Sequence, residues 1–243
     1  MNDRPVVVTG GAGGIGSAIV ARLVEDGHPV AVLDLHPAAA PTAGAPGSVF
    51  SYPCDIADLD AVEQAVAEFE AEAGVPFGLV NNAGWDQALP FLETGPDLWE
   101  KVIDVNLRGP VNVTHAVLRR LAEAGRGRVV SIASDAGRVG SSGEAVYSAC
   151  KGGIIAFMKT LAREHARQGI TFNSVCPGPT DTPLLDSFDE SGRLAEALER
   201  AIPMRRLGRP EDFPGLVAFL LSDEASFITG QTVSVSGGLS MQG

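Results

Sequence analysis

The segment that most limits what this chain can fold into is a glycine-rich turn close to its N-terminus. Residues 10–16 read GGAGGIG and follow a β-branched run at residues 5–9, which is typical of a buried strand. Apolar residues then recur at helical spacing from Ile15 to Val24, and Gly27 stands where a helix C-cap belongs. A strand, a tight glycine turn and a helix in this order predict the first unit of a doubly wound α/β sheet.

The same alternation continues along the whole chain. Further strands are predicted at residues 29–34, 77–80, 128–132, 170–175 and 232–235, and helices near 58–73, 97–122, 145–167 and 210–221. Strands that alternate with helices pair in parallel through right-handed crossovers. We therefore expect one doubly wound (Rossmann) domain over residues 1–243, with a mostly parallel sheet of about seven strands.

Two segments do not fit the alternation. Residues 36–48 carry three prolines and two glycines where a crossover helix is expected, so this segment is predicted to be mostly loop. Residues 177–192 form a long connection after a predicted strand. Long loops at strand ends often cover a ligand, and this one is predicted to be a substrate lid, with Leu184 and Leu185 at its tip.

Charge and composition exclude several classes of function. The formal net charge of −12 disfavours binding to nucleic acid. Three widely spaced cysteines without a CxxC pair are typical of packed thiols in a reducing compartment, and no histidine pair has the spacing of a zinc helix. The N-terminal segment lacks the apolar core of a signal peptide, and the longest apolar run, Gly215 to Leu221, is far short of a membrane span. The chain is therefore expected to be cytoplasmic, with no metal and no membrane partner.

The glycine turn and Asp34 together predict the cofactor. Glycines let the backbone approach a pyrophosphate, which the free N–H groups of the helix N-terminus bind. Asp34 ends the second predicted strand, 18 residues after Gly16. A carboxylate there binds both ribose hydroxyls of NAD and repels the 2′-phosphate of NADP. Since no basic residue lies in the turn or just after Asp34, the predicted cofactor is NAD.

Four polar residues suggest the chemistry. Tyr147 and Lys151 are four residues apart on a predicted helix, so they share a face. A nearby ammonium is expected to lower the pKa of the phenol, which then exchanges a proton with an alcohol or carbonyl oxygen. Ser134 follows a predicted strand and can hydrogen-bond the same oxygen. Asn106 interrupts a helical pattern, where it marks a local kink or is simply a tolerated polar residue.

Over nearly its whole length, the chain resembles the short-chain dehydrogenase/reductase superfamily. The resemblance rests on residues 9–16, the NNAG at 81–84, Asp55-Ile56 and Pro177-Gly178, together with Asn106, Ser134, Tyr147 and Lys151 as the catalytic tetrad. It implies a homotetramer, in which the Asn holds a water of a proton relay, the Ser orients the substrate and the Tyr transfers the proton. The implied cofactor contacts are Gly10, Gly14, Ile15, Gly16, Asp34, Leu35, Asp55, Ile56, Asn82, Ala83, Gly84, Tyr147, Lys151, Pro177, Gly178, Thr180 and Thr182.

A narrower similarity concerns the substrate. The segments at 81–86, 132–151 and 176–182 resemble the 2-hydroxycyclohexanecarboxyl-CoA dehydrogenases of that superfamily, which oxidise a β-hydroxyacyl thioester on a ring during alicyclic and aromatic acid degradation. Candidate substrate contacts are then Ser134, Tyr147, Trp85 as an apolar wall and Arg138 on a thioester arm, although Trp85 equally suits ordinary packing and Arg138 suits solvation. Arg205, Arg206 and Arg209 form a basic cluster that suits CoA phosphates.

Two other functions stay open on the sequence. A 3-oxoacyl-carrier-protein reductase shares the same tetrad and differs in cofactor and in the carrier of the acyl group. A non-catalytic dinucleotide-binding protein would bind the cofactor without turnover.

Overall fold

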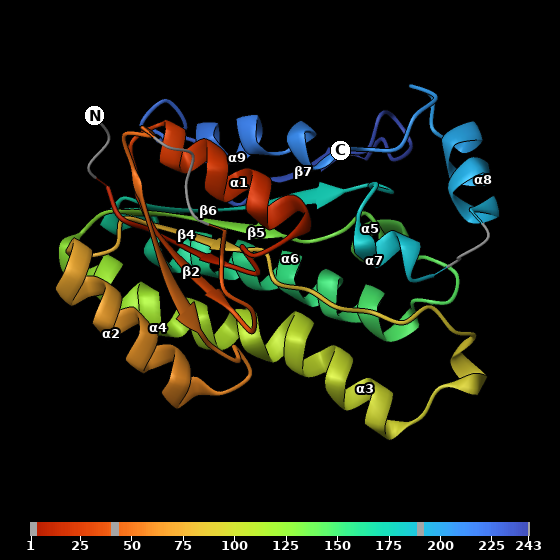
Figure 1. The fold of residues 1–243 in the computed structure, drawn as a ribbon, viewed down its shortest axis with the longest axis horizontal. Helices are drawn as coiled ribbons and strands as arrows, with labels where there is room; N and C mark the ends of the chain where they lie inside the picture. The colour runs from red at the N-terminus through yellow and green to blue at the C-terminus, as the bar shows by residue number, and fades with distance from the viewer. Residues whose placement is uncertain (1–3, 40–43, 189–191, 243) are drawn as a thin grey trace.

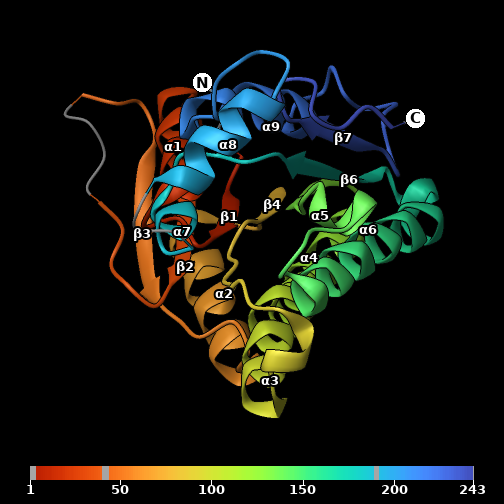
Figure 2. The same ribbon diagram turned by 90° about the vertical axis from the view of Figure 1, so that its right-hand side faces the viewer.

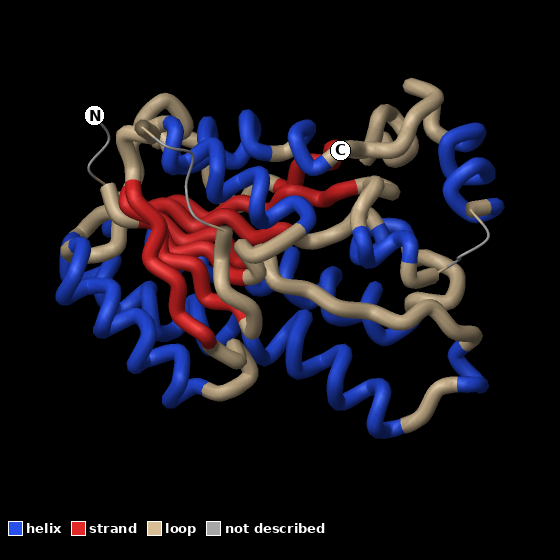
Figure 3. The backbone as a smooth tube through the Cα atoms, in the orientation of Figure 1, coloured by secondary structure: helices blue, strands red, loops and turns tan. Residues whose placement is uncertain are grey.

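The computed structural model describes residues 4–39, 44–188 and 192–242, and its centre is a single parallel sheet between two helical layers (Figures 1 and 3). The seven strands are β1 (Val6–Thr9), β2 (Pro29–Asp34), β3 (Ser48–Pro53), β4 (Gly78–Asn81), β5 (Gly127–Ile132), β6 (Ile170–Pro177) and β7 (Thr232–Val235). Every neighbouring pair runs parallel. The predicted fold class is confirmed.

The order of the strands explains where a ligand can bind. The sheet runs β3-β2-β1-β4-β5-β6-β7, so the direction of winding reverses between β1 and β4. In doubly wound sheets this reversal opens a crevice at the carboxyl ends of the strands. Figure 2 looks onto that edge, where α5 (Ala136–Val139), α7 (Pro183–Asp186) and α8 (Arg193–Ala201) gather.

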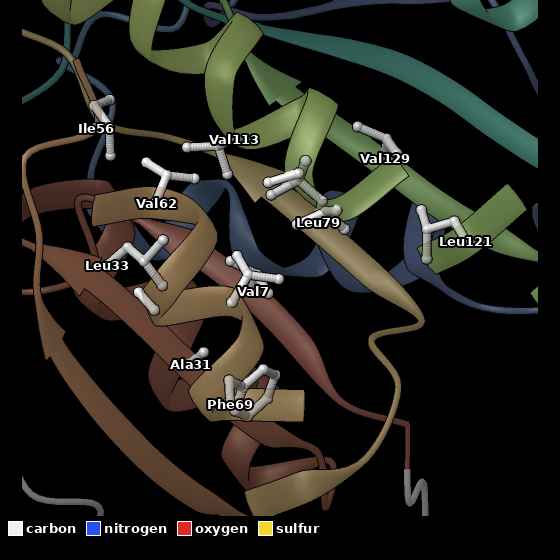
Figure 4. Packing of buried hydrophobic residues seen from close by; sticks show 14 of the residues in the cluster. Val7, Ala31, Leu33, Ile56, Val62, Phe69, Leu79, Val113, Leu121 and Val129 are labelled. Atoms are coloured by element: carbon white, nitrogen blue, oxygen red, sulfur yellow. The ribbon is translucent and has the colours of Figure 1, made fainter. Parts of the chain in front are cut away.

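The two faces of the sheet bury separate clusters because successive strand residues point to opposite sides. Val6 and Val8 pack with α1 (Gly14–Glu25) and α9 (Pro214–Leu221). Val7 lies on the other face, where α2 (Leu59–Ala73), α4 (Gly109–Ala124) and α6 (Ala145–His165) cover it. Figure 4 shows this second cluster around Val7, Leu33 and Phe69.

Two details of the fold go beyond the predicted ranges. The first is strand β3, which the sequence ranges lacked; it lies at the edge of the sheet, where a residue such as Pro53 is tolerated. The second is the helix predicted at 97–122, which consists of α3 (Pro96–Ile103) and α4 joined by a π-helical turn, η2 (Asp104–Arg108). That turn contains Asn106, so of the two interpretations of this residue the structure supports the local kink.

The remaining elements are short or lie in loops. Three 3₁₀ turns complete the structure: η1 (Phe91–Glu93), η3 (Ala166–Gln168) and η4 (Pro210–Asp212). The described part of residues 36–48 is loop up to Ser48, where β3 begins. The connection after β6 contains α7. No helix in the described ranges combines the length and apolarity that crossing a membrane needs.

Candidate active site

The glycine turn is held against the strand-end loop that follows β4. Gly10 has a φ of +64°, and a β-carbon added there would lie 2.7 Å from the Cα of Ala83. A β-carbon on Gly16 would lie 2.0 Å from the carbonyl oxygen of Gly10. Only glycine therefore allows the turn, the first residues of α1 and the loop after β4 to pack so closely.

The start of α1 has the properties of a phosphate site. Its N-cap residue, Gly13, provides no side-chain hydrogen bond, and a β-carbon added to Gly13 would meet no atom within 4 Å. No side-chain cap therefore occupies the first backbone N–H groups of the helix at its positive end. The residues present fit the pyrophosphate of a dinucleotide.

The NNAG segment at residues 81–84 holds this turn in place through hydrogen bonds. The Asn82 amide donates to the carbonyl oxygens of Thr9 and Gly10, at 3.1 and 2.9 Å. The Thr9 hydroxyl accepts from the backbone N–H groups of Asn82 and Ala83, both at 3.0 Å. These four bonds fix Gly84 at the carboxyl end of β4, beside the catalytic candidates.

Asp34 ends β2 with both carboxylate oxygens engaged by the backbone. One oxygen accepts from the N–H of Ala12 and the other from the N–H of His36, each at 3.0 Å. These bonds orient the carboxylate beside the glycine turn, where lone pairs still remain for a ligand. Leu35 follows with 68% of its side chain exposed, so an apolar surface adjoins the carboxylate.

The predicted adenine side contains one exposed and one buried residue. Asp55 is exposed and accepts from the N–H of Ala57 at 2.9 Å. Ile56 is buried against Gly109 at the start of α4, and its carbonyl oxygen accepts from Asn112 at 3.1 Å. Asp55 therefore offers a side chain to a ligand, whereas Ile56 is available mainly through its backbone.

The segment after β6 crosses in front of the glycine turn. A β-carbon added to Gly14 would lie 3.8 Å from Cγ2 of Thr182, which precedes α7. Pro177 ends β6, and Gly178 packs so closely on Ser236 that a β-carbon would lie 2.7 Å away. The Thr180 hydroxyl donates to the carbonyl of Gly178 at 2.8 Å. The predicted nicotinamide residues thus lie along one wall of the crevice.

Asn106 is fully buried in the π-helical turn. Its amide donates to the carbonyl oxygens of Trp85 and Val102, at 2.6 and 2.9 Å, and its oxygen accepts from the Trp85 N–H at 3.3 Å. A β-carbon on Gly84 would lie 3.1 Å from the Asn106 oxygen and 3.4 Å from Nζ of Lys151. Gly84 therefore leaves the room in which these two polar groups approach each other.

Tyr147, Lys151 and Ser134 meet at the carboxyl end of β5. Nζ of Lys151 lies 5.4 Å from the centre of the Tyr147 ring and donates to the carbonyl oxygen of Ile132 at 3.1 Å. The Ser134 hydroxyl accepts from the N–H of Ala136 at 3.1 Å and also hydrogen-bonds the phenol of Tyr147. All four residues of the predicted tetrad are thus drawn to one end of the sheet.

The electrostatics of the phenol differ from the prediction. Burial raises the pKa of Tyr147 above its ordinary value, and the charge of Glu144 adds to the increase, while the hydrogen bond with Ser134 opposes it. Burial also lowers the pKa of Lys151 to about 8. The prediction that the ammonium makes this phenol acidic is therefore wrong, because burial is the largest cause of the shift and Lys151 is not among its causes.

The candidate substrate residues separate into different environments. Trp85 contacts Asn106 through its backbone, and Nζ of Lys101 lies 3.6 Å from the centre of its ring. Arg138 donates to the Ser234 hydroxyl at 2.6 Å and to the carbonyl of Gln242 at 2.8 Å. Those bonds favour a structural role for Arg138, and its contact with a substrate arm stays a prediction.

A pocket next to Tyr147 involves residues that the sequence reasoning missed. Its wall contains Asp86, Glu144, Phe91, Trp99, Leu89 and Val102. Phe91 and Trp99 are stacked, with ring centres 5.7 Å apart, and Trp99 donates to the Thr94 hydroxyl at 2.7 Å. The segments around Asp86 and Glu144 carried the narrower sequence similarity, but nothing in their spacing indicated that the two residues line one pocket.

The basic cluster is partly neutralised. Arg206 forms two hydrogen bonds with the carboxylate of Asp212, at 2.6 and 2.8 Å, which raises the pKa of the guanidinium. Arg205 has a positive φ of 58° and donates to the carbonyl of Arg200. Arg205, Arg206 and Arg209 are all exposed. Their binding of CoA phosphates stays a prediction.

Comparison with known proteins places the chain among reductases. A family model described as Enoyl-(Acyl carrier protein) reductase matches residues 10–240. Acetoacetyl-CoA reductase of Shinella zoogloeoides is 40% identical over 238 residues, which cover 97% of this chain and 98% of that protein. The 3-oxoacyl-[acyl-carrier-protein] reductase MabA of Mycobacterium tuberculosis is 38% identical over 239 residues, which cover 98% and 94%.

Solved structures share the same architecture. A variant of the actinorhodin polyketide ketoreductase with NADPH superposes with a TM-score of 0.88 at 33% identity, covering 97% of each chain. The 3-oxoacyl-[acyl-carrier protein] reductase of Brucella melitensis has a TM-score of 0.88 at 34% identity, covering 98% of this chain and 92% of the other.

Proposed function

Because the chain belongs to the short-chain dehydrogenase/reductase superfamily, we propose that it is an oxidoreductase that interconverts a secondary alcohol and a ketone on an acyl thioester. The observation that carries this proposal is the meeting of the phenol of Tyr147 with Ser134 and a buried Lys151. Lys151 adjoins Gly84, in the loop after β4 that packs on the glycine turn. The acetoacetyl-CoA and 3-oxoacyl-carrier-protein reductases among its relatives support a β-oxoacyl or β-hydroxyacyl substrate.

The proposed residues divide the chemistry among them. A bound nicotinamide dinucleotide supplies the hydride for the carbonyl carbon, or accepts it from the carbinol carbon. Ser134 hydrogen-bonds the substrate oxygen and stabilises its developing charge. Tyr147 gives a proton to that oxygen during reduction and takes one from it during oxidation. Lys151 and Asn106, which both adjoin Gly84, return the proton to Tyr147 through a water that Asn106 holds.

The decisive experiment removes the phenol hydroxyl. Tyr147→Phe keeps the ring and is expected to lower kcat by at least about 10²-fold, the scale of general acid–base catalysis. Fluorescence titration with NADH should show that the variant still binds the cofactor. Tyr52→Phe is the matched control, because Tyr52 is the only other tyrosine of the chain and bonds Glu72 at 2.8 Å. A Tyr147→Phe protein with near wild-type turnover would overturn the mechanism.

Within this activity we propose NAD as the cofactor. Asp34 supports it, since a carboxylate beside the glycine turn repels a 2′-phosphate. The test compares kcat/KM for NADH and NADPH in the wild type and in Asp34→Ser. The wild type should prefer NADH, and the variant should lose most of that preference. A wild type that prefers NADPH contradicts this assignment and leaves the proposed reaction untouched.

For the substrate, we propose 2-hydroxycyclohexanecarboxyl-CoA or a similar β-hydroxyacyl-CoA. Phe91 is 53% exposed and stacks on Trp99, and this apolar surface supports a ring or an acyl chain on the substrate. The 3-oxoacyl-carrier-protein reductase is the second candidate, favoured by MabA and the Brucella structure. Turnover of CoA thioesters of cyclic and linear hydroxy acids is compared with that of carrier-bound 3-oxoacyl groups. Binding without turnover of any of these would favour a non-catalytic protein.

The arginine cluster and the lid belong to the same proposal. If Arg205 and Arg206 hold CoA phosphates, the double Arg205→Ala, Arg206→Ala variant raises KM for a CoA thioester and leaves KM for a simple cyclic alcohol unchanged. An unchanged KM for the thioester rejects this part. We propose that the segment 177–192, of which residues 189–191 lie outside the described residues, closes over the substrate, and that the protein is a homotetramer in the cytoplasm. Native mass spectrometry tests the tetramer.

A further inference from the structure

The segment that carries Ser134 is held in place by several neighbouring elements. The backbone N–H of Ala133 donates to the carbonyl oxygen of Val175 at 2.8 Å. That of Asp135 donates to the carbonyl oxygen of Pro177 at 3.1 Å, so β6 holds both neighbours of the serine. The helix α5 starts directly afterwards and has only four residues. Helices this short are not stable by themselves, so the place of α5 depends on contacts with other elements.

The first of these contacts is with α6. A β-carbon added to Gly137 would lie 2.6 Å from the backbone nitrogen of Gly152 and 2.6 Å from the carbonyl carbon of Lys151. The backbone of α5 therefore packs directly on the turn of α6 that carries Lys151. This packing prevents α5 from moving closer to α6, and other contacts have to prevent it from moving away.

The second set of contacts joins α5 to β7 through the hydroxyl of Ser234. Asp135 is the N-cap residue of α5, where an aspartate usually accepts from the first N–H groups of the helix. Its side chain makes no such bond and accepts from the Ser234 hydroxyl instead. Arg138 donates to the oxygen of the same hydroxyl at 2.6 Å and to the carbonyl oxygen of Gln242 at 2.8 Å. The hydroxyl therefore gives its only proton to the carboxylate and accepts one from the guanidinium.

Asp135 depends strongly on this hydroxyl. Its side chain belongs to a residue that is only 5% exposed, and its Oδ2 atom has no hydrogen-bond partner among the described residues. A buried carboxylate is costly unless it is hydrogen-bonded or paired. Ser234, which lies 99 residues further along the chain, supplies the side-chain hydrogen bond that the structure gives to this carboxylate. Loss of the hydroxyl therefore leaves the carboxylate without that donor and releases both ends of α5 from β7.

We propose that Asp135, Arg138 and Ser234 are positioning residues that hold α5 so that the hydroxyl of Ser134 points toward the reacting oxygen. This inference rests on the proposed role of Ser134 in the reaction. The Ser134 hydroxyl accepts from the N–H of Ala136, the first residue of α5, at 3.1 Å, so a movement of α5 turns the hydroxyl. A displacement of about 1 Å at a reacting group is enough to slow a reaction strongly. The three side chains thus affect the reaction without touching the substrate.

The test is a double-mutant cycle, measured as kcat for the reduction of acetoacetyl-CoA with NADH. Ser134→Ala should lower kcat about 10²-fold. Ser234→Ala should lower it about 10-fold, with NADH binding retained in fluorescence titrations. In the Ser134→Ala background, Ser234→Ala should cause no further loss, because the hydroxyl that it positions is already absent. Ser234→Thr keeps a hydroxyl and should restore most of kcat. A purely structural role would lower kcat by the same factor in both backgrounds.

Arg138→Met should behave like Ser234→Ala, and Arg120→Met is its matched control. Arg120 on α4 also joins two elements, since it donates to Glu70 at 2.6 Å and to the carbonyl oxygen of Ala116 at 2.9 Å. Its replacement should leave kcat unchanged. If Arg138 instead touches the substrate arm, Arg138→Met raises KM for the thioester and leaves kcat for a simple cyclic alcohol unchanged. That result overturns the positioning role.

Hydrogen exchange separates this inference from the proposed function, because it needs no turnover. The backbone N–H groups of residues 136–139 should exchange about 10-fold faster in Ser234→Ala than in the wild type, while those of β1 stay unchanged. If the wild type reduces no ketone, the proposed function fails, and exchange still decides whether β7 holds α5. Unchanged exchange at residues 136–139, or an equal loss of kcat in both backgrounds, overturns the inference. If Ser234→Ala does not fold, Arg138→Met decides in its place.

Discussion

Replacing Lys151 by methionine should stabilise the protein while it abolishes the proposed activity. Lys151 is 3% exposed on α6, and its pKa falls from the ordinary 10.5 to about 8 because burial disfavours the ammonium. At about 1.4 kcal/mol for each pKa unit, holding the charge in the folded protein costs about 3 kcal/mol at neutral pH. Methionine has a similar length and carries no charge to desolvate.

The variant also loses one favourable contact. The Lys151 ammonium donates to the carbonyl oxygen of Ile132 at 3.1 Å. Losing that bond reduces the expected gain in the stability of the variant by about 1 kcal/mol. Lys151→Met should therefore be about 2 kcal/mol more stable than the wild type at about pH 7. Between the two pKa values the unfolded chain binds more protons than the folded one, so this lysine's contribution to stability rises with pH. The advantage of the variant should shrink by about 2 kcal/mol at about pH 9.5.

Urea denaturation of both proteins at the two pH values measures this difference directly. Lys159→Met on the same helix is the matched control, since Lys159 is exposed and its replacement should change stability little at either pH. The reasoning is refuted if Lys151→Met is destabilised at neutral pH, or if the difference from the wild type does not depend on pH. An equal pH dependence in Lys159→Met would refute it as well.

Three smaller predictions concern the same scaffold. Gly16→Ala should lower stability by about 1–3 kcal/mol and abolish NADH binding in fluorescence titrations, because its β-carbon would lie 2.0 Å from the Gly10 oxygen; retained binding contradicts it. Asn106→Ala should lower the free energy of unfolding by about 2 kcal/mol in urea denaturation, because two buried carbonyl groups lose their donor. Asn106→Asp also lacks the donor and should not restore this stability. Asp58→Ala removes the side-chain cap of α2 and should cost about 1 kcal/mol without changing turnover; a change in turnover would contradict this purely local role.

The elements that the sequence predicted well are those with a local cause. The turn around Gly10 and Gly16 follows from steric limits within a few residues, and its position between β1 and α1 was correctly predicted. The kink at Asn106 was one of two interpretations of a polar residue in an apolar pattern, and the structure decided between them. Strand β3 was missed because it is an edge strand with Ser51 and Pro53, which weaken the alternation that marks a strand.

Side-chain partners were harder to predict. Arg138 and Arg206 both looked available to a ligand, yet Ser234, Gln242 and Asp212 occupy their guanidinium groups. The partners of Arg138 come from a distant segment that meets it only in the folded chain, whereas Asp212 follows Arg206 within the same loop. Their contacts depend on how β7 and the loop before α9 pack, and no periodic pattern in the sequence records that packing.

The amino-acid sequence by itself determined the layered fold, the dinucleotide crevice and the identity of the catalytic candidates, because glycine geometry and apolar periodicity act over short stretches of chain. Only the tertiary structure decided the electrostatics of Tyr147. The pKa of a buried group depends on the solvent it loses and on every charge nearby, and here those charges include Asp86 and Glu144 from two different elements. The spacing of residues along the chain does not indicate either quantity, so only the fold determined the direction in which the pKa of Tyr147 is shifted.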